Sequence, residues 1–304
     1  MKPRSWLRLP LPLLAAAAIA TWAVPGSAAV TAPAAQHLTA PAAARAATPA
    51  CNPIASSLRP AGPPQVTPGS FMATIRARGY LIAGVSQSTY HFGFLNPLDG
   101  KIEGFDVDMV HAIAKAIFGN PNKVVFKAIS DDQRIPAIRS GAVDIVAHTM
   151  TINCERLKDV DFSSVYFEAG QQVLVLKNSR AKSLADLGGK KVCATAGSTS
   201  IANIKAARPR PIPVAAANFT DCLVLLQQGD VAAISTDNSI LDGLKAQDPW
   251  TKIVGPVFTS EPYGLAISQQ HPDFVRFATA GVPRSRTGRS RDAAGRWPGR
   301  TAQR

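Results

Sequence analysis

The chain has 304 residues, of which 46% are hydrophobic, and a formal net charge of +13 at pH 7. This length is enough for two lobes, each with its own hydrophobic core. The first eight residues carry three of the net positive charges and the last 24 carry six, which leaves four for the long middle. The middle therefore has no strong basic face, which removes the main support for a nucleic-acid-binding function.

The N-terminus has the pattern of a signal peptide over residues 1–29. A basic start precedes the apolar run Leu7–Ala20, and small residues suited to signal-peptidase cleavage follow it. The run contains two prolines and is shorter than the roughly 20 residues that a membrane helix needs. We therefore expect a secreted protein of the cell envelope. Residues 30–68, rich in alanine and proline, predict a flexible stalk.

The chain after the stalk alternates short apolar runs with amphipathic segments, which predicts an α/β fold. This pattern is typical of a mostly parallel sheet with helices on both faces. We expect helices over 71–78, 104–118, 134–139 and 220–226 and from 274, with a polar and aromatic loop over 86–94. We expect strands over 80–85, 123–129, 143–147, 169–177, 230–234 and 261–267, with a further strand ending at 194.

One stretch, residues 141–156, combines a buried strand with polar side chains. Thr149, Thr151 and Asn153 follow the apolar run, and Arg156 lies on the first turn of a helix. Hydroxyl donors beside a planar guanidinium can form a receptor for a carboxylate. The alternative is a turn whose threonines cap the helix and whose arginine faces water. The stretch alone does not separate the two interpretations.

Seven short motifs occur in order between residues 70 and 280. They are Gly104–Asp108, Thr149–Arg156, Asp161–Ser163, Leu187–Val192, Gly197–Ser200, Ser235–Asp237 and Pro262–Gly264. Together they resemble the extracellular solute-binding proteins of the polar amino-acid family, most of all its glutamate- and glutamine-binding members.

The resemblance implies a two-lobed periplasmic-binding-protein-like fold of type II, in which two strands cross between the lobes. Lobe 1 would comprise 69–172 and 262–281, and lobe 2 would comprise 173–261. The ligand would be a free amino acid held in the cleft, and the partner an ABC transporter permease or a membrane sensor. We expect a monomer without a cofactor or a metal.

The resemblance also assigns ligand-binding roles. Arg156 matches the arginine that binds the ligand's α-carboxylate, with the hydroxyl of Thr151 and the backbone of Thr149 beside it. Asp237 matches the carboxylate that receives the α-ammonium, and Thr199 matches a second-lobe residue near the ligand. With the arginine and the aspartate on opposite lobes, the ligand would bridge them, so binding would favour closure.

Two positions bear on specificity. Arg134 matches a position that acidic-amino-acid binders fill with arginine, where a second guanidinium could take a side-chain carboxylate. Its alternative is a solvated pair with Asp131 or Asp132. Ser86 is a further candidate ligand residue, and it stands where many glutamine and basic amino-acid binders carry an aspartate. We therefore expect glutamate or aspartate as the ligand, with glutamine as the alternative.

Other functions on this fold need different residues. Some relatives are dehydratases, which need a general acid or base near the ligand. His148, Asp131, Asp132 and Glu168 are the candidates, and no pair among them shows a division of labour. We therefore expect a binding protein and not an enzyme. An adhesive surface protein is a further alternative, against which the charged groups on the two lobes argue.

The four cysteines of an exported chain suggest two disulfides, for which three pairings exist. Cys193 and Cys222 fall in the same lobe, so we expect them to pair. Cys51 and Cys154 would then form the other bridge. A zinc site is the alternative, but the sequence has no Cys-x-x-Cys spacing.

The C-terminal residues 282–304 have neither helical nor strand periodicity. They contain seven arginines and recurring glycine and proline, with Pro283 near the start. We expect a basic, disordered tail. It is either a genuine tail or the product of a reading-frame change that replaced the terminal helix found in the family that the chain resembles.

Overall fold

The computed structural model describes residues 51–54, 58–60 and 62–281. The predicted signal peptide, most of the predicted stalk and the predicted tail 282–304 lie outside these described residues. Within them, no helix combines the length and apolar character that a membrane span requires.

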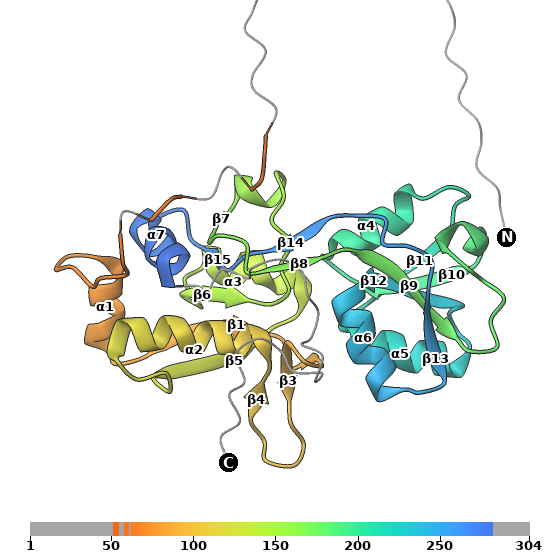
Figure 1. Ribbon diagram of the computed structural model, residues 1–304, viewed down its shortest axis with the longest axis horizontal. Helices are drawn as coiled ribbons and strands as arrows, with labels where there is room; N and C mark the ends of the chain where they lie inside the picture. Colours follow the sequence, from red (N-terminus) through yellow and green to blue (C-terminus); the bar gives the residue numbers. More distant parts are fainter. Residues whose placement is uncertain (1–50, 55–57, 61, 282–304) are drawn as a thin grey trace, which may run out of the picture. The chain divides into compact units, whose positions relative to one another are not determined.

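Five strands form the first sheet (Figure 1). In spatial order they are β5 (Val124–Ala128), β1 (Leu81–Val85), β6 (Ile145–Ala147), β15 (Ala266–Ile267) and β7 (Asp161–Phe162). β1 pairs in parallel with β5 and β6, whereas β15 pairs antiparallel with β6 and β7. Because β15 runs opposite to both of its neighbours, the other four strands run in one direction, so the sheet is mostly parallel, as predicted, with one antiparallel strand. The chain reaches β15 from another strand, without the helical crossover that a parallel strand needs.

Helices cover both faces of this sheet. They are α1 (Phe71–Arg78), α2 (Phe105–Phe118) and α7 (Pro272–Gly281) on one face and α3 (Arg134–Arg139) on the other. Successive residues of a strand face opposite sides. Accordingly, Ile145 and Ala147 join the core under α2, while Val146 joins a separate core under α3. The apolar positions of α2 recur at helical spacing, which buries one side of this helix.

The second sheet has the same mixed character. Its spatial order is β11 (Ile212–Ala216), β10 (Lys191–Thr195), β12 (Ala233–Asp237), β9 (Gln171–Leu176) and β13 (Thr251–Val254). β10 pairs in parallel with β11 and β12, and β9 pairs antiparallel with β12 and β13. Its core also includes side chains of α4 (Thr199–Ala206), α5 (Phe219–Gln228), α6 (Asn238–Gln247) and the short 3-10 helix η3 (Leu184–Leu187).

Two antiparallel strands connect the sheets, β8 (Phe167–Ala169) and β14 (Glu261–Tyr263) (Figure 1). β8 leads directly into β9 of the second sheet, and β14 leads back to β15 of the first. The expected continuous strand 261–267 is thus two strands, interrupted where Gly264 passes close to the side chain of Ile152. Because Gln171 already pairs within the second sheet, that sheet begins two residues before the predicted boundary at 173.

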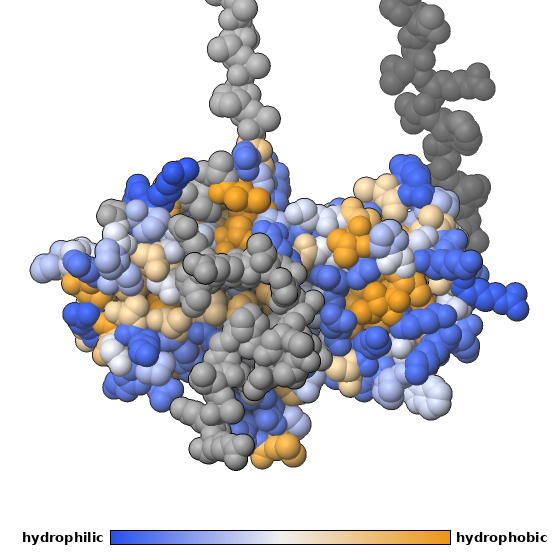
Figure 2. All heavy atoms as spheres, viewed as in Figure 1, coloured by the Kyte–Doolittle hydropathy of each residue, from blue (hydrophilic) through white to orange (hydrophobic). Residues whose placement is uncertain are grey.

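The expected loop 86–94 is partly a small sheet. Its strands are β2 (Ser88–Thr89), β3 (Gly93–Leu95) and β4 (Ile102–Glu103). Gly93 makes the fold of this segment possible, because a Cβ there would lie 2.6 Å from the carbonyl oxygen of Ser86. Figure 2 shows hydrophobic atoms at the tip of the hairpin formed by β3 and β4, where the Leu98 residue is 93% exposed.

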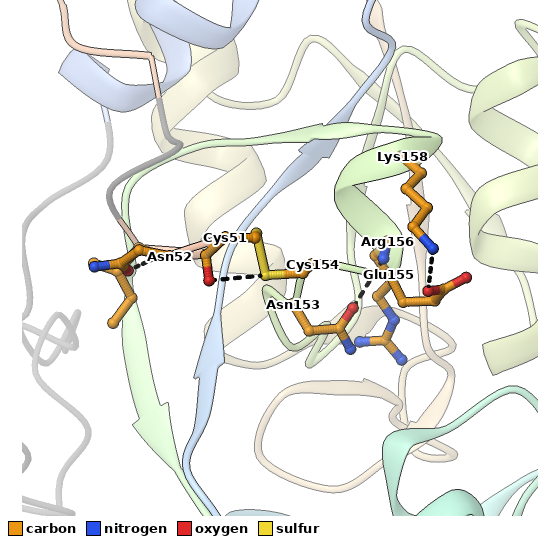
Figure 3. Close-up of a disulfide and its surroundings, with 8 residues drawn as sticks. Cys51, Asn52, Asn153, Cys154, Glu155, Arg156 and Lys158 are labelled. Carbon is orange, nitrogen blue, oxygen red and sulfur yellow. Dashed lines mark hydrogen bonds and ion pairs between the residues drawn. A yellow bond between two sulfur atoms is a disulfide. The ribbon is translucent and has the colours of Figure 1, made fainter. Parts of the chain in front are cut away.

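Both expected disulfides are formed. Cys193 of β10 pairs with Cys222 of α5, and Cys51 pairs with Cys154. No free cysteine occurs among the described residues, so none is left for the alternative zinc site. Figure 3 shows the second bridge beside Asn153 and Arg156.

The end of the predicted stalk differs from the expectation. Leu58 and Val66 pack against the core of the first lobe, and the side chain of Arg276 on α7 donates a hydrogen bond to the carbonyl of Arg59 at 3.0 Å. Leu58, Arg59 and Val66, which the sequence analysis placed in the stalk, therefore contact the first lobe.

Candidate functional site

A cavity lies where loops of the two lobes meet. Six of the seven predicted ligand residues line it, namely Arg134, Thr149, Thr151, Arg156, Thr199 and Asp237. The other lining residues are Asp131, Ser198, Ser200, Phe219, Thr236 and Ile240. The loops follow the carboxyl ends of β6, β10 and β12, which is where open α/β sheets bind ligands.

Arg156 is buried in this cavity. It begins the 3-10 helix η2 (Arg156–Lys158), and its backbone N–H donates to Oδ1 of Asn153 at 2.9 Å, as Figure 3 shows. Its guanidinium donates to the carbonyl of Thr151 at 2.7 Å and to that of Gly197 at 3.3 Å. Burial, followed by the charge of Arg134, lowers the pKa of Arg156 to about 9. The group remains a cation at neutral pH and can pair with a carboxylate.

Asp237 is the buried anion on the second lobe. It ends β12, and its Oδ2 accepts a hydrogen bond from the hydroxyl of Tyr263 at 2.5 Å. Its Oδ1 is buried and has no hydrogen-bond partner among the described residues. Burial, followed by the negative charge of Glu261, raises the pKa of Asp237 to about 7. A carboxylate oxygen in this position can receive the N–H group of a cation.

Arg134 is already paired. Its guanidinium lies 2.7 Å from Oδ1 of Asp131, and both side chains are about 95% buried, with 4% and 6% exposed. It also donates to the carbonyls of His148 and Gly197. Burial alone would raise the pKa of Asp131, but the charge of Arg134 and other interactions lower it below its usual value. The pair with Asp131, which the alternative interpretation placed in water, is thus formed but buried, and the guanidinium has its counter-charge within the protein.

The backbone N–H of Thr149 is engaged by the protein itself. It donates to Oδ2 of Asp106 at 2.8 Å, and the hydroxyl of Tyr166 donates to the other carboxylate oxygen at 2.5 Å. This bond holds Thr149 at a φ of 41°, in the left-handed region that residues other than glycine seldom adopt. Burial raises the pKa of Asp106 to about 6. The sequence placed Asp106 in the first motif without revealing this contact.

Glu261 is a site residue that sequence reasoning missed. Its Oε2 accepts hydrogen bonds from the hydroxyls of Thr151 at 2.7 Å and Thr199 at 2.9 Å, and its Oε1 lies 3.5 Å from the amide nitrogen of Asn203. The carboxylate therefore joins the crossing strand β14 to both lobes. The only signal in the sequence is its position directly before the motif Pro262–Gly264.

Ser86 does not line the cavity. Its hydroxyl accepts the backbone N–H groups of Ser88 and Thr89, each at 3.2 Å, and shares a hydrogen bond of 2.9 Å with the hydroxyl of Thr89. These bonds close the turn before β2, so the side chain serves the local fold. Ser86 therefore does not contact the cavity in place of the aspartate that many glutamine and basic amino-acid binders carry at this position.

The candidate acids and bases are not arranged for catalysis. Nε2 of His148 lies 2.9 Å from the carbonyl of Ile129, and burial lowers its pKa, so the ring is neutral at pH 7. Asp131 lies 3.5 Å from Nδ1 of His148, but its oxygens are engaged by Arg134 and Thr195. Asp132 and Glu168 are exposed and lie outside the lining of the cavity. Among the described residues, no cluster of three metal-ligating side chains occurs.

Gly197 brings the second lobe against the first. Its carbonyl accepts hydrogen bonds from both guanidinium groups, those of Arg134 and Arg156. It has a φ of 73°, and a Cβ there would lie 2.7 Å from Cα of Asp132. Only glycine allows this close approach of the two backbones.

The comparisons with known proteins agree with this site and fold. Residues 81–260, more than half of the chain, match the model of the bacterial extracellular solute-binding proteins, family 3. The chain belongs to this family, as the seven motifs predicted. It is 42% identical over 199 residues to the ABC transporter glutamine-binding protein GlnH of Bacillus subtilis. The aligned region covers 65% of this chain and 73% of the relative.

Two further matches are to proteins whose names state the amino acid that they bind. The chain is 31% identical over 213 residues to an L-glutamate/L-aspartate-binding protein of Pseudomonas aeruginosa, covering 66% of this chain and 70% of the relative. A solved structure of an ancestral arginine-binding protein bound to glutamine is 40% identical, with a TM-score of 0.63 and coverage of 67% and 91%. The predicted two-lobed fold of type II is thus confirmed. The chain is an amino-acid solute-binding protein of ABC transport.

Proposed function

We propose that the chain captures glutamine between its lobes for import by an ABC transporter. The observation that carries this proposal is the buried ion pair of Arg134 with Asp131. The expectation of an acidic ligand required Arg134 to offer its charge to a side-chain carboxylate of the ligand. Since Asp131 already supplies that carboxylate, a neutral amide side chain fits better, because it brings no further charge into a buried site.

The balance of charge around the cavity supports the same ligand. Two guanidinium groups, those of Arg134 and Arg156, stand against three carboxylates, those of Asp131, Asp237 and Glu261. A zwitterion without side-chain charge leaves this balance unchanged. Glutamate, whose side chain is ionised, would add one net negative charge to an existing excess of negative charge, at a cost that the low local dielectric increases.

In the proposed complex the two ends of the zwitterion bridge the lobes. Arg156 on the first lobe binds the α-carboxylate, and Oδ1 of Asp237 on the second lobe receives the α-ammonium. Both groups line the cavity and both are buried. The ligand would then satisfy Oδ1 of Asp237, which lacks a partner among the residues that the structure describes, so binding stabilises the arrangement in which the lobes meet.

The proposed setting is the cell envelope. Residues 1–29 would direct export, and the folded protein would deliver its ligand as a monomer to a transporter permease in the membrane. The identity to a relative named as an ABC transporter glutamine-binding protein supports a transporter over a sensor.

A panel experiment tests the function. The full chain without its signal peptide is mixed with each of the twenty amino acids, and the shift in melting temperature is measured. We expect the largest shift with glutamine, and we expect chromatography to recover the bound glutamine unchanged. A chemically altered amino acid would indicate an enzyme, and the absence of any shift would favour the surface-protein alternative.

A further inference from the structure

Glu261 lies where the crossing strands, the first lobe and the second lobe share a carboxylate. It is the first residue of β14 and is only 3% exposed. Thr151 comes from the first lobe and Thr199 from the second, and both hydroxyls converge on the same oxygen, Oε2. Both threonines line the cavity, whereas Glu261 lies behind them, outside the lining residues.

The chemistry of a carboxylate fixes how these hydroxyls can act. An ionised carboxylate only accepts hydrogen bonds, so each threonine hydroxyl must donate its one O–H hydrogen bond to Glu261. The hydroxyl oxygens then have only lone pairs left for the cavity. Neither threonine hydroxyl can therefore donate to the ligand, and both can only accept from an N–H group. The α-carboxylate is left to Arg156, and a second carboxylate would find no hydroxyl donor at Thr151 or Thr199.

Glu261 also contributes charge, and no described residue forms a direct ion pair with it. Its negative charge is felt at Arg156, where it favours the cation, and at Asp237, where it opposes ionisation. Tyr263, Arg156 and Asp131 also act on the carboxyl of Asp237: Tyr263 donates a hydrogen bond to it, the charge of Arg156 favours its ionisation and the charge of Asp131 opposes it. The carboxylate thus leaves the cavity with an excess of negative charge.

We propose that Glu261 is a specificity-determining residue, which selects against ligands with a net negative charge by fixing two hydroxyls as acceptors and by its own buried charge. The proposal rests on the proposed function, in that the ligand is an amino acid held in this cavity. Glu261 acts through Thr151 and Thr199 and need not touch the ligand. A purely structural role for Glu261 in the crossing strands would weaken all ligands equally.

The test measures a ratio of affinities. Calorimetry gives the Kd for glutamate and for glutamine with the full chain and with E261Q, E261M and E261D. For E261Q we expect the glutamate-to-glutamine ratio of Kd values to fall at least tenfold. The substitution removes one buried negative charge, and it no longer fixes the hydroxyls of Thr151 and Thr199 as acceptors. E261M, which also lacks the charge, should shift the ratio in the same direction. E261D keeps the charge and should retain the ratio within about threefold.

Glu168 supplies the matched control. It lies on β8, directly opposite Pro262 of β14, but it is exposed. E168Q removes the same charge from the same pair of strands, and water should screen its effect, so the ratio should stay that of the wild type. Circular dichroism establishes which variants are folded, and E261M gives the same readout if E261Q does not fold.

The outcomes separate the two proposals. A wild-type protein that prefers glutamate overturns the proposed function, whatever the variants do. A wild-type protein that prefers glutamine, with E261Q or E261M weakening both ligands by the same factor, overturns the role of Glu261 and leaves the proposed function intact.

Discussion

At the scale of single residues, the site holds a carboxylate that the fold does not fully satisfy. Asp237 is buried, has one oxygen without a partner among the described residues, and lies near the negative charge of Glu261. An unsatisfied buried acceptor costs about 1–3 kcal/mol. Such a cost at a binding residue is expected where the ligand supplies the missing partner.

The substitution Asp237→Asn should separate binding from stability. Without the negative charge, the α-ammonium loses its partner, and we expect the affinity for glutamine to fall at least a hundredfold. The ligand-free protein should become more stable at pH 8, by about 1–3 kcal/mol, because a buried charge is removed. Calorimetry measures the first effect and urea denaturation the second. A variant that binds like the wild type would show that Asp237 does not receive the ligand.

The same residue predicts how binding depends on pH. The pKa of Asp237 is raised to about 7 in the folded protein, so below this pH the carboxyl is protonated and cannot accept from the α-ammonium. Affinity should fall about tenfold per pH unit below 7 and be level just above it, and it should fall again as the pH approaches 9, because Arg156, with a pKa of about 9, then loses its charge. For stability the sign is opposite: the raised pKa favours the folded protein at low pH, and this contribution is lost as the pH rises through about 7. Titrations between pH 5 and 9 that give a constant affinity would contradict this assignment.

Arg134 should matter for folding more than for selectivity. Arg134→Ala leaves Asp131 buried without its partner, and we expect a loss of roughly 3–5 kcal/mol in the free energy of unfolding. Arg139→Ala, on the same helix, breaks an exposed pair with Asp159 and should cost about 0–1 kcal/mol. Urea denaturation at pH 7.5 compares the two. Equal losses would mean that the pair of Arg134 and Asp131 is as weak as a surface pair.

The sequence predicted which residues at the strand ends of the two lobes would line the cavity, but it did not predict their hydrogen-bond partners. Arg156 and Asp237 stand in motifs that follow strands, and both line the cavity. The contact of Thr151 with Glu261 spans 110 positions in the sequence, and that of Thr149 with Asp106 spans 43. Hydrogen bonds over such distances depend on the three-dimensional packing, so no local pattern reveals them.

At the scale of elements, the periodic helices were predictable and the short strands were not. Apolar residues at helical spacing predict α2, and its expected range differs from the observed one by a single residue. The strands β2 and β3 have two and three residues, too few to show alternation. The antiparallel direction of β15 follows from the route of the chain through β14, which is a tertiary feature.

The turn at Gly197 offers a test of how the lobes meet. In Gly197→Ala the new Cβ would collide with the backbone of Asp132, so the lobes could not approach as they do, and we expect the affinity for glutamine to fall at least tenfold. Gly189→Ala is the matched control, because Gly189 also has a positive φ, of 70°, but has nothing within 4 Å. Both variants carry the strain of about 1–2 kcal/mol for a left-handed residue. Equal affinities in the two variants would show that this contact is not needed for binding.

At the scale of the whole molecule, two lobes of similar construction share one buried group of charges. Each lobe contributes its own strand ends, and the crossing strands add Glu261 between them. Selectivity therefore depends on the sum of charges from three parts of the chain. This is why Arg134, considered alone, suggested an acidic ligand, whereas Arg134 together with Asp131 and Glu261 favours a neutral one.

The most direct measurement is a calorimetric titration of the full chain with glutamine and with glutamate at pH 7.5. We predict that glutamine binds at least tenfold more tightly than glutamate, because the side-chain carboxylate of glutamate would add one net negative charge to the buried group. A protein that binds glutamate as tightly as glutamine, or more tightly, would contradict the assignment of Arg134 to Asp131 as a closed pair and with it the proposed ligand.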